Sequence, residues 1–254
     1  MLIAVVAAIG GSAGVAAAFP PVYATTTANT PWTELIAPSG GAPSLFNVSC
    51  PDAADCYAVG QAGTVKAGSA TTAWSGVASG TPLDLFGVAC ASTTTCFAAG
   101  GTTGSGVVVG TTTGVAGWHV MLTTSQQLNG ISCSSTTTCV AVGENGLIER
   151  SVDGGASWAI RASGTVQTLY AVSCPAATIS CLAVGGLGTY DTSGTSGAGW
   201  QLHSNGSIQE LRSVWCMSRS RCIVGTSASA WVVTGFTTWT QVDNNASYEP
   251  WCVS

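Results

Sequence analysis

Residues 128–143 read LNGISCSSTTTCVAVG, and this pattern of leucine, a β-branched residue, two cysteines and a glycine occurs five times in the chain. The copies are LFNVSCPDAADCYAVG from Leu45, LFGVACASTTTCFAAG from Leu85, LNGISCSSTTTCVAVG from Leu128, LYAVSCPAATISCLAVG from Leu169 and LRSVWCMSRSRCIVG from Leu211. The first cysteines of successive copies are 40, 43, 41 and 42 residues apart. A period of this length indicates a repeat fold.

Tryptophan residues keep the same period independently of the cysteines. They are Trp32, Trp74, Trp118, Trp158, Trp200 and Trp239, with spacings of 42, 44, 40, 42 and 39 residues. Two separate markers that recur together over five periods make a chance alignment very improbable. The chain of 254 residues is therefore expected to fold as one large repeat domain over residues 25–254.

Each period contains four segments typical of short strands. The first is L-x-x-V-x-C, the second is C-x-A-V-G, the third is weaker, as in residues 146–150, and the fourth starts at the tryptophan. The leucine and valine of the first strand lie three residues apart, so they are expected to face opposite sides of the sheet. Burial on both sides is what a blade between two neighbours requires. The sequence therefore predicts an all-β propeller of four-stranded blades.

The repeated cysteines flank the turn between the first and second strands, where antiparallel pairing brings two side chains within disulfide reach. We expect five bridges, namely Cys50–Cys56, Cys90–Cys96, Cys133–Cys139, Cys174–Cys181 and Cys216–Cys222. Zinc sites use closer cysteine spacing and additional ligands, and His119 and His203 do not accompany the pairs. Five disulfides point to an oxidising compartment, and so to a secreted or cell-surface protein.

The N-terminal segment and the overall charge limit the possible partners. Residues 2–19 are uncharged and mostly apolar, which predicts a signal peptide or an N-terminal hydrophobic anchor over residues 1–24. Cleavage would fall after Val22-Tyr23-Ala24, and membrane contact is expected only if this segment is not cleaved. The six basic residues and net charge of −5 exclude a typical nucleic-acid interface, which needs clustered lysine and arginine.

Residues 151–158 read SVDGGASW, which matches the Asp-box, or bacterial neuraminidase repeat. In this hairpin the aspartate bonds turn amides, the glycines allow positive φ and the tryptophan packs between blades. With the repeated V-S-C and C-x-A-V-G segments, residues 32–254 resemble Asp-box propellers of the photosystem II stability/assembly factor type, and more distantly sialidases and xyloglucan-hydrolysing propellers. The resemblance implies a ring of six or seven blades and structural roles for Ser151, Asp153, Gly155 and Trp158.

The sequence offers few residues for catalysis. A sialidase needs an arginine cluster, and a glycosidase needs two carboxylates about 5–10 Å apart. The arginines lie at unrelated blade positions, and the one acid that stands out is Glu144, in a loop between second and third strands that opens onto the usual binding face of a propeller. No catalytic residue, metal site or cofactor is predicted. The candidate binding face holds mainly amides and is expected to include Gln61, Gln127, Glu144, Asn145 and Gln167.

Three functions follow from these observations. The first is a non-catalytic binding or assembly propeller with a protein or glycan ligand. The alternatives are a carbohydrate-active enzyme of sialidase or glycoside-hydrolase type and a structural cell-surface protein. Trp32 is expected to mark a lone fourth strand, and the eleventh cysteine, Cys252, to mark a lone first strand. Together they predict a split or truncated sixth blade beside the five complete ones.

Overall fold

The computed structural model describes residues 22–24, 33–36, 43–69, 72–218, 221–226 and 229–243. Each of the five repeats forms one four-stranded antiparallel sheet whose strands follow their sequence order. The strands are β3 (Leu45–Ser49), β4 (Cys56–Gly60), β5 (Val65–Gly68) and β6 (Ser75–Val77) in blade 1; β7 (Leu85–Cys90), β8 (Cys96–Thr102), β9 (Ser105–Thr111) and β10 (His119–Thr124) in blade 2; β11 (Leu128–Cys133), β12 (Cys139–Gly143), β13 (Ile148–Ser151) and β14 (Ala159–Ile160) in blade 3; β15 (Leu169–Ser173), β16 (Cys181–Gly185), β17 (Thr189–Ser193) and β18 (Gln201–Ser204) in blade 4; and β19 (Leu211–Ser218), β20 (Arg221–Thr226), β21 (Ala230–Thr234) and β22 (Thr238–Asp243) in blade 5.

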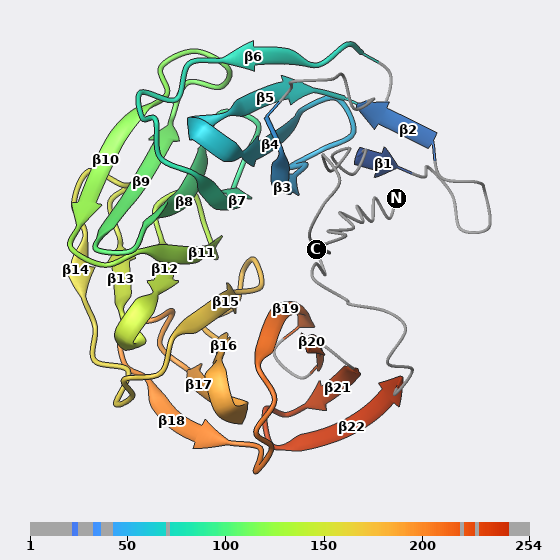
Figure 1. Ribbon diagram of the computed structural model, residues 1–254, viewed down its shortest axis with the longest axis vertical. Coiled ribbons are helices and arrows are strands. Elements are labelled where there is room, and N and C mark those ends of the chain that lie inside the picture. Colours follow the sequence, from blue (N-terminus) through green and yellow to red (C-terminus); the bar gives the residue numbers. More distant parts are fainter. Residues whose placement is uncertain are drawn as a thin grey trace, which may run out of the picture.

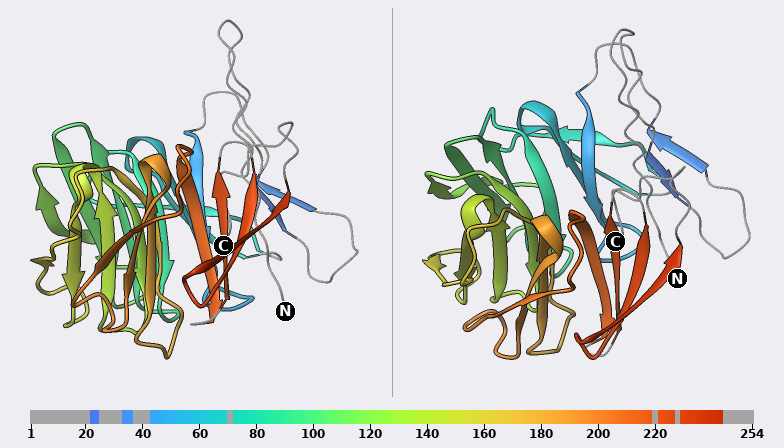
Figure 2. Two further views of the ribbon diagram at one scale, coloured as in Figure 1. Left: turned by 90° about the horizontal axis from the view of Figure 1, so that it is seen from below. Right: turned by 60° about the horizontal axis from the view of Figure 1, so that its bottom comes forward.

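The five blades follow one another around a common centre (Figure 1). The first strand of each blade lies nearest the centre and the fourth lies at the perimeter, while the strands run roughly along the central axis (Figure 2). Each first strand contacts the first strand of the next blade, from β3 to β19. This radial arrangement of four-stranded sheets is a β-propeller, as the repeat pattern predicts.

Some sequence predictions fall on residues outside the described ranges. These are Trp32 and Cys252, on which the split sixth blade depends, and residues 1–21 of the N-terminal apolar run. A two-stranded antiparallel sheet pairs β1 (Val22–Ala24) with β2 (Thr33–Ile36). Among the described residues, no helix has the length and apolar character needed to cross a membrane.

The leucine and the β-branched residue of the first strand face the same neighbouring blade in blades 2 to 5, so the prediction that they face opposite sides is wrong. Leu128 and Ile131, for example, pack in one core cluster with Phe97 and Val108 of blade 2. The cause is a one-residue bulge: Leu128 and Gly130 are two residues apart but pair with the consecutive Gly143 and Val142. A bulge changes the alternation of side chains along the strand. The same irregularity begins β3, β7, β15 and β19.

Burial on both sides belongs instead to the second strands. Every residue of β4, β12 and β16 is buried. β12 and β16 form core clusters with the blades on either side, as Ala141 does toward blade 2 and Val140 toward blade 4. The second strand is therefore the centre of the packing between blades, and burial of its apolar side chains is the main source of stability.

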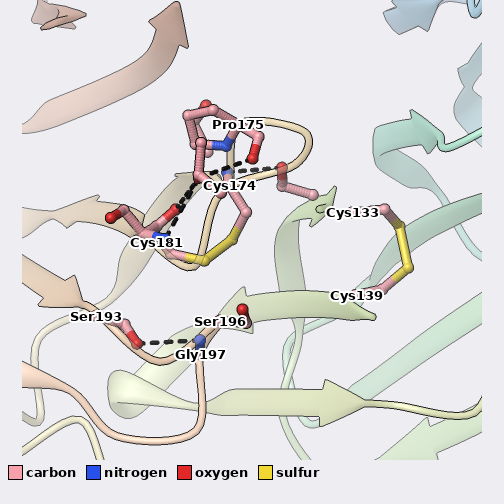
Figure 3. Close-up of a disulfide and its surroundings, with 12 residues drawn as sticks. Cys133, Cys139, Cys174, Pro175, Cys181, Ser193, Ser196 and Gly197 are labelled. Atoms are coloured by element: carbon pink, nitrogen blue, oxygen red, sulfur yellow. Dashed lines mark hydrogen bonds between the residues drawn. A yellow bond between two sulfur atoms is a disulfide. The ribbon is translucent and has the colours of Figure 1, made fainter. Parts of the chain in front are cut away.

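All five predicted disulfides join the first and second strands of their own blades. Figure 3 shows the bridge between Cys174 and Cys181 beside that between Cys133 and Cys139. A serine preceding the first cysteine links blades at the same level: Ser132 Oγ accepts a hydrogen bond of 2.9 Å from the amide of Cys174. Ser49 and Ser173 bond the next blade in the same way. These bonds tie the disulfide turns of blades 1 and 2, of blades 3 and 4, and of blades 4 and 5, while blade 2 has Ala89 at the position of the serine.

The Asp-box forms a closed hydrogen-bonded hairpin between β13 and β14. Asp153 Oδ1 accepts bonds of 2.9 Å from Ser151 Oγ and from the amide of Ser157, and Ser151 Oγ accepts a bond from the amide of Gly155. Trp158 meets the ring of Phe97 in blade 2 edge to face, with centroids 6.3 Å apart. The hairpin therefore anchors the outer edge of blade 3 on blade 2.

Blade 4 keeps part of this geometry although its sequence lacks the aspartate. Ser193 Oγ accepts a bond of 3.0 Å from the amide of Gly197, as Figure 3 shows. Thr195 stands where blade 3 has Asp153, and its hydroxyl accepts a bond from the amide of Gly199. A hydroxyl pair can thus hold the turn that the Asp-box holds with a carboxylate.

Candidate functional site

Two kinds of loop meet at one end of the propeller, which we call the entry face. It consists of the turns between second and third strands and the loops that connect successive blades. The turns of blades 1, 3 and 4 are the 3₁₀ segments η1 (Gln61–Gly63), η2 (Glu144–Gly146) and η3 (Gly186–Gly188). Each is bonded to the loop before its own first strand, as Glu144 N is to Gln127 O at 3.0 Å. The disulfide turns and the Asp-box hairpin lie at the opposite end.

Blade 2 differs from this pattern. Its second strand, β8, continues past the glycine at which the sequence predicts a turn and ends at Thr102, where a tight hairpin leads into β9. Gly101 and Gly104 have φ of 146° and 81°, a region open to glycine but unfavourable for other residues. The entry face therefore carries a β-hairpin at blade 2 and short helical turns at blades 1, 3 and 4.

A central cavity of about 640 Å³ is lined by the first strands of all five blades. Trp215, further along β19, lines the cavity, and the bulged second residue of each first strand contributes the other larger side chains, each of them half-buried. These second residues are Phe46, Phe86, Asn129, Tyr170 and Arg212. Because the second residue lies near the start of its strand, this set lies toward the entry face.

One side of the cavity is aromatic and the other is polar. Phe46 and Phe86 stack with ring centroids 5.6 Å apart and planes at 26°. On blades 4 and 5, Tyr170 donates a hydrogen bond of 3.1 Å to Glu210 Oε1, and Glu210 forms an ion pair with Arg212. The Arg212 guanidinium lies 4.8 Å from the centre of the Tyr170 ring. Burial, followed by the Glu210 charge, raises the pKa of Tyr170, so its hydroxyl stays a donor at neutral pH.

Amide side chains lie between the aromatic side and the polar side of the cavity. Asn129 Nδ2 donates to Leu169 O at 3.0 Å, and Gln127 Nε2 donates to Asn129 Oδ1 at 2.9 Å. Glu144 Oε2 accepts a bond of 3.3 Å from the backbone amide of Gln127. The wall formed by blades 3 and 4 therefore presents fixed amide groups, which suit hydrogen bonding to a peptide or a sugar.

The residues that follow the second residues are small in blades 2, 3 and 4, where they are Gly87, Gly130 and Ala171. A Cβ on Gly87 would lie 3.2 Å from the Cα of Gly130, and a Cβ on Gly130 would lie 3.1 Å from the Cα of Ala171. The first strands of blades 2, 3 and 4 therefore approach one another almost as bare backbone. This close packing fixes the second residues around the cavity.

All five residues predicted for the binding face lie at the entry face, and the structure brings some of them together. Gln127 and Glu144 are hydrogen-bonded, and Asn145 follows Glu144 in η2. Gln167 lies close to the turn of blade 4, because a Cβ placed on Gly186 would be 3.4 Å from Gln167 Oε1. Gln61 lies apart from these residues, in η1 of blade 1.

The sequence analysis missed the residues that line the cavity. Their signal was present, because the second residue of the L-x-x-V-x-C segment is phenylalanine, asparagine, tyrosine or arginine while its neighbours recur. Recognising it required the bulge, because regular alternation would place the second residue on the same face as the β-branched fourth residue.

The carboxylates most affected by burial lie outside the cavity. Asp191 on β17 is fully buried, neither of its oxygens has a hydrogen-bond partner among the described residues, and burial raises its pKa to about 7. Glu149 on β13 is also buried, which raises its pKa, although the charge of Arg161 acts in the opposite direction. Among the described residues lining the cavity, the charged side chains are Asp52 and Arg212.

No family model and no curated protein matches this chain. Several solved structures do. YCF48 from Cyanidioschyzon merolae has a TM-score of 0.63 at 14% identity, over 90% of this chain and 80% of that chain. A structure of YCF48 bound to a D1 peptide has a TM-score of 0.60 at 14% identity, over 80% and 69%.

Two further solved structures, of differently named proteins, also match this chain. The WD40 β-propeller domain of Doa1 has a TM-score of 0.60 at 14% identity, over 78% of this chain and 68% of that one. A GH74 xyloglucanase from Xanthomonas campestris has a TM-score of 0.60 at 12% identity, over 80% of this chain but 38% of the enzyme. At these identities the likeness establishes the β-propeller fold. Function has to be argued from the site.

Proposed function

We propose that this chain is a non-catalytic binding propeller that holds a segment of a partner protein at its entry face. The observation that carries the proposal is the central cavity, in which five blades contribute four different side-chain types at one position, while the leucine, the β-branched residue and the cysteine of the motif recur. An aromatic pair opposite a Tyr170–Glu210–Arg212 cluster can receive a side chain with an apolar body and a polar end. The peptide complex of YCF48 supports the choice of a polypeptide ligand.

The proposal places the protein outside the cytoplasm. Five disulfides are typical of an oxidising compartment. The apolar run at residues 2–19 supports export, with residues 1–24 acting as a signal peptide or as an anchor and residues 25–254 forming the exported domain. The protein is then secreted or held at the cell surface, where it meets its partner.

The test is selection of a phage-displayed random dodecapeptide library on the purified, oxidised protein. Enriched peptides are synthesised with a fluorescein label, and their affinities are measured by fluorescence polarisation. Phe86→Ala should weaken binding about tenfold, because it removes an aromatic contact at the cavity. Val152→Ala, in the Asp-box hairpin at the opposite end, is the matched control and should bind as the unchanged protein does.

A glycan array and a hydrolysis assay on xyloglucan and sialosides address the other candidates. Binding to a glycan with no peptide enrichment would overturn the choice of a polypeptide ligand. Release of reducing sugar by the oxidised protein would establish the carbohydrate-active alternative instead, which the GH74 match favours at the level of fold.

A further inference from the structure

Three exposed aliphatic side chains lie on neighbouring segments of the entry face. Val166 is 79% exposed, Leu187 is 54% exposed and Ile208 is 86% exposed. We call them the aliphatic triad. Val166 lies in the loop before β15, Leu187 is the middle residue of η3, and Ile208 lies in the loop before β19.

Backbone hydrogen bonds hold these three segments side by side. The amide of Gly186, before Leu187, donates to Thr168 O at 3.0 Å, and the amide of Gly188, after Leu187, donates to Gln209 O at 2.7 Å. Leu187 is therefore fixed between the loops that carry Val166 and Ile208. An ordered aliphatic surface of this kind differs from single apolar residues scattered over a protein.

Leu187 also has a backbone conformation that does not suit leucine. Its φ is 54°, in the left-handed region, which is uncommon for a bulky residue. The equivalent residues in the other two 3₁₀ turns are Ala62 and Asn145, with φ of 52° and 54°. The turn thus forms without leucine, and asparagine fits this conformation better. An exposed leucine at a strained position points to a role in binding.

The aliphatic triad is continuous with the cavity. Tyr170 lies four residues after Val166, and Glu210 lies two residues after Ile208. Tyr170 and Glu210 are hydrogen-bonded to each other, so the two loops meet at the polar side of the cavity. A ligand in the cavity that extends outward over blade 4 therefore meets the aliphatic triad.

Two carboxylates lie beside this surface, and Arg212 neutralises one of them. Glu210, two residues beyond Ile208, forms an ion pair with Arg212, whereas Glu144 begins the turn against which the loop of Val166 packs, since a Cβ on Gly146 would clash with Thr165 O. The chain as a whole has a net charge of −5. Charge complementarity therefore favours a partner with basic residues beside its apolar ones.

From these observations we propose that the aliphatic triad is a second contact area for the same partner, which is a polypeptide segment carrying aliphatic or aromatic side chains next to lysine or arginine. The proposal rests on the proposed function and extends it from the cavity to blade 4. Aliphatic side chains offer neither ring faces nor hydrogen bonds to sugar hydroxyls, which favours a polypeptide over a glycan at this surface.

The test uses the dodecapeptides selected on the unchanged protein, which should combine apolar residues with lysine or arginine. Affinities are compared for Leu187→Asn, for the double variant Leu187→Asn/Ile208→Asn and for the control Val152→Asn. Asparagine at position 187 suits the left-handed turn, so the fold is preserved, and the thermal midpoint verifies this. The double variant should bind at least about tenfold more weakly, while the control should change by less than about twofold.

Each outcome decides the matter. If Phe86→Ala weakens binding and the double variant does not, the aliphatic triad is not a contact area, and the proposed function stands. Enrichment of acidic peptides would also overturn the inference, because it contradicts the charge argument. If no peptide is enriched over the bare support, both the proposed function and this inference fail.

Discussion

Asp191 makes the stability of the propeller depend on pH in an unusual direction. Its side chain lies opposite Ala183 across β16 and β17, and Ala183 belongs to the core between blades 3 and 4. Directly opposed residues of an antiparallel pair share a face, so the Asp191 carboxyl faces blade 3. Arg150 of blade 3 also reaches toward blade 4, but its Nε donates to Ser196 O at 2.7 Å rather than to the carboxyl.

The direction of the effect follows from the pKa. In the folded protein burial raises the pKa of Asp191 to about 7. In the unfolded chain an aspartate has a pKa of about 3.9. Between these two values the folded state keeps the proton and the unfolded state releases it, so rising pH favours unfolding. The contribution of Asp191 to stability is therefore greatest below pH of about 4, falls by about 1.4 kcal/mol per pH unit up to about 7, and is constant above.

The magnitude is large enough to measure by equilibrium unfolding. From pH 5 to 7.5 the shift of Asp191 removes about 2.5 kcal/mol from the free energy of unfolding. Asp191→Asn cannot titrate, so guanidinium unfolding of the oxidised variant should lack this loss. The pKa of Glu149 is raised in the same direction, but Glu149 is present in both proteins, so the comparison isolates the effect of Asp191. An equal loss of stability in the two proteins between pH 5 and 7.5 would refute the reasoning.

Two further predictions concern the disulfide turns and the close approach of the first strands at Gly130. Replacing Cys133 and Cys139 together by serine opens a loop with a sequence separation of 6, and chain entropy predicts a loss of roughly 2 kcal/mol in guanidinium unfolding; a loss below about 0.5 kcal/mol would show that the turn is stable without its bridge. Gly130→Val places a branched side chain 3.1 Å from the Cα of Ala171 and should cost about 1–3 kcal/mol. Gly76→Val on β6, where a Cβ meets nothing within 4 Å, is the matched control for thermal unfolding, and an equal cost at both positions would contradict the packing argument.

The repeated residues were sufficient to predict the blades because they carry the packing between them. Leu128, Ile131, Cys139 and Ala141 lie in one interblade core, and the equivalent residues of the other repeats lie in the equivalent cores. A position that must fit the same surroundings in every blade keeps the same residue type. The period, the strand order and the disulfides could therefore be inferred from recurrence alone.

The bulge could not be inferred in the same way. Nothing in L-x-x-V-x-C distinguishes a regular strand from one with an extra residue, since both bury the leucine and the valine. Strict alternation puts Leu128 and Ile131 on opposite sides, and the bulge returns them to the same side. The error in predicted direction follows from treating a bulged strand as regular.

The same bulge explains why the cavity residues vary. The second residue of each first strand faces the central cavity and lies outside the interblade cores, so its replacement leaves the packing of leucine, valine and cysteine intact. Phe86 and Asn129 can therefore occupy equivalent positions in adjacent blades, although one is apolar and the other forms hydrogen bonds with Gln127 and Leu169. A propeller built in this way separates the residues that specify its fold from those that we propose contact a ligand. On this proposal, its binding preference can change through five side chains while the repeat that identifies the fold stays the same.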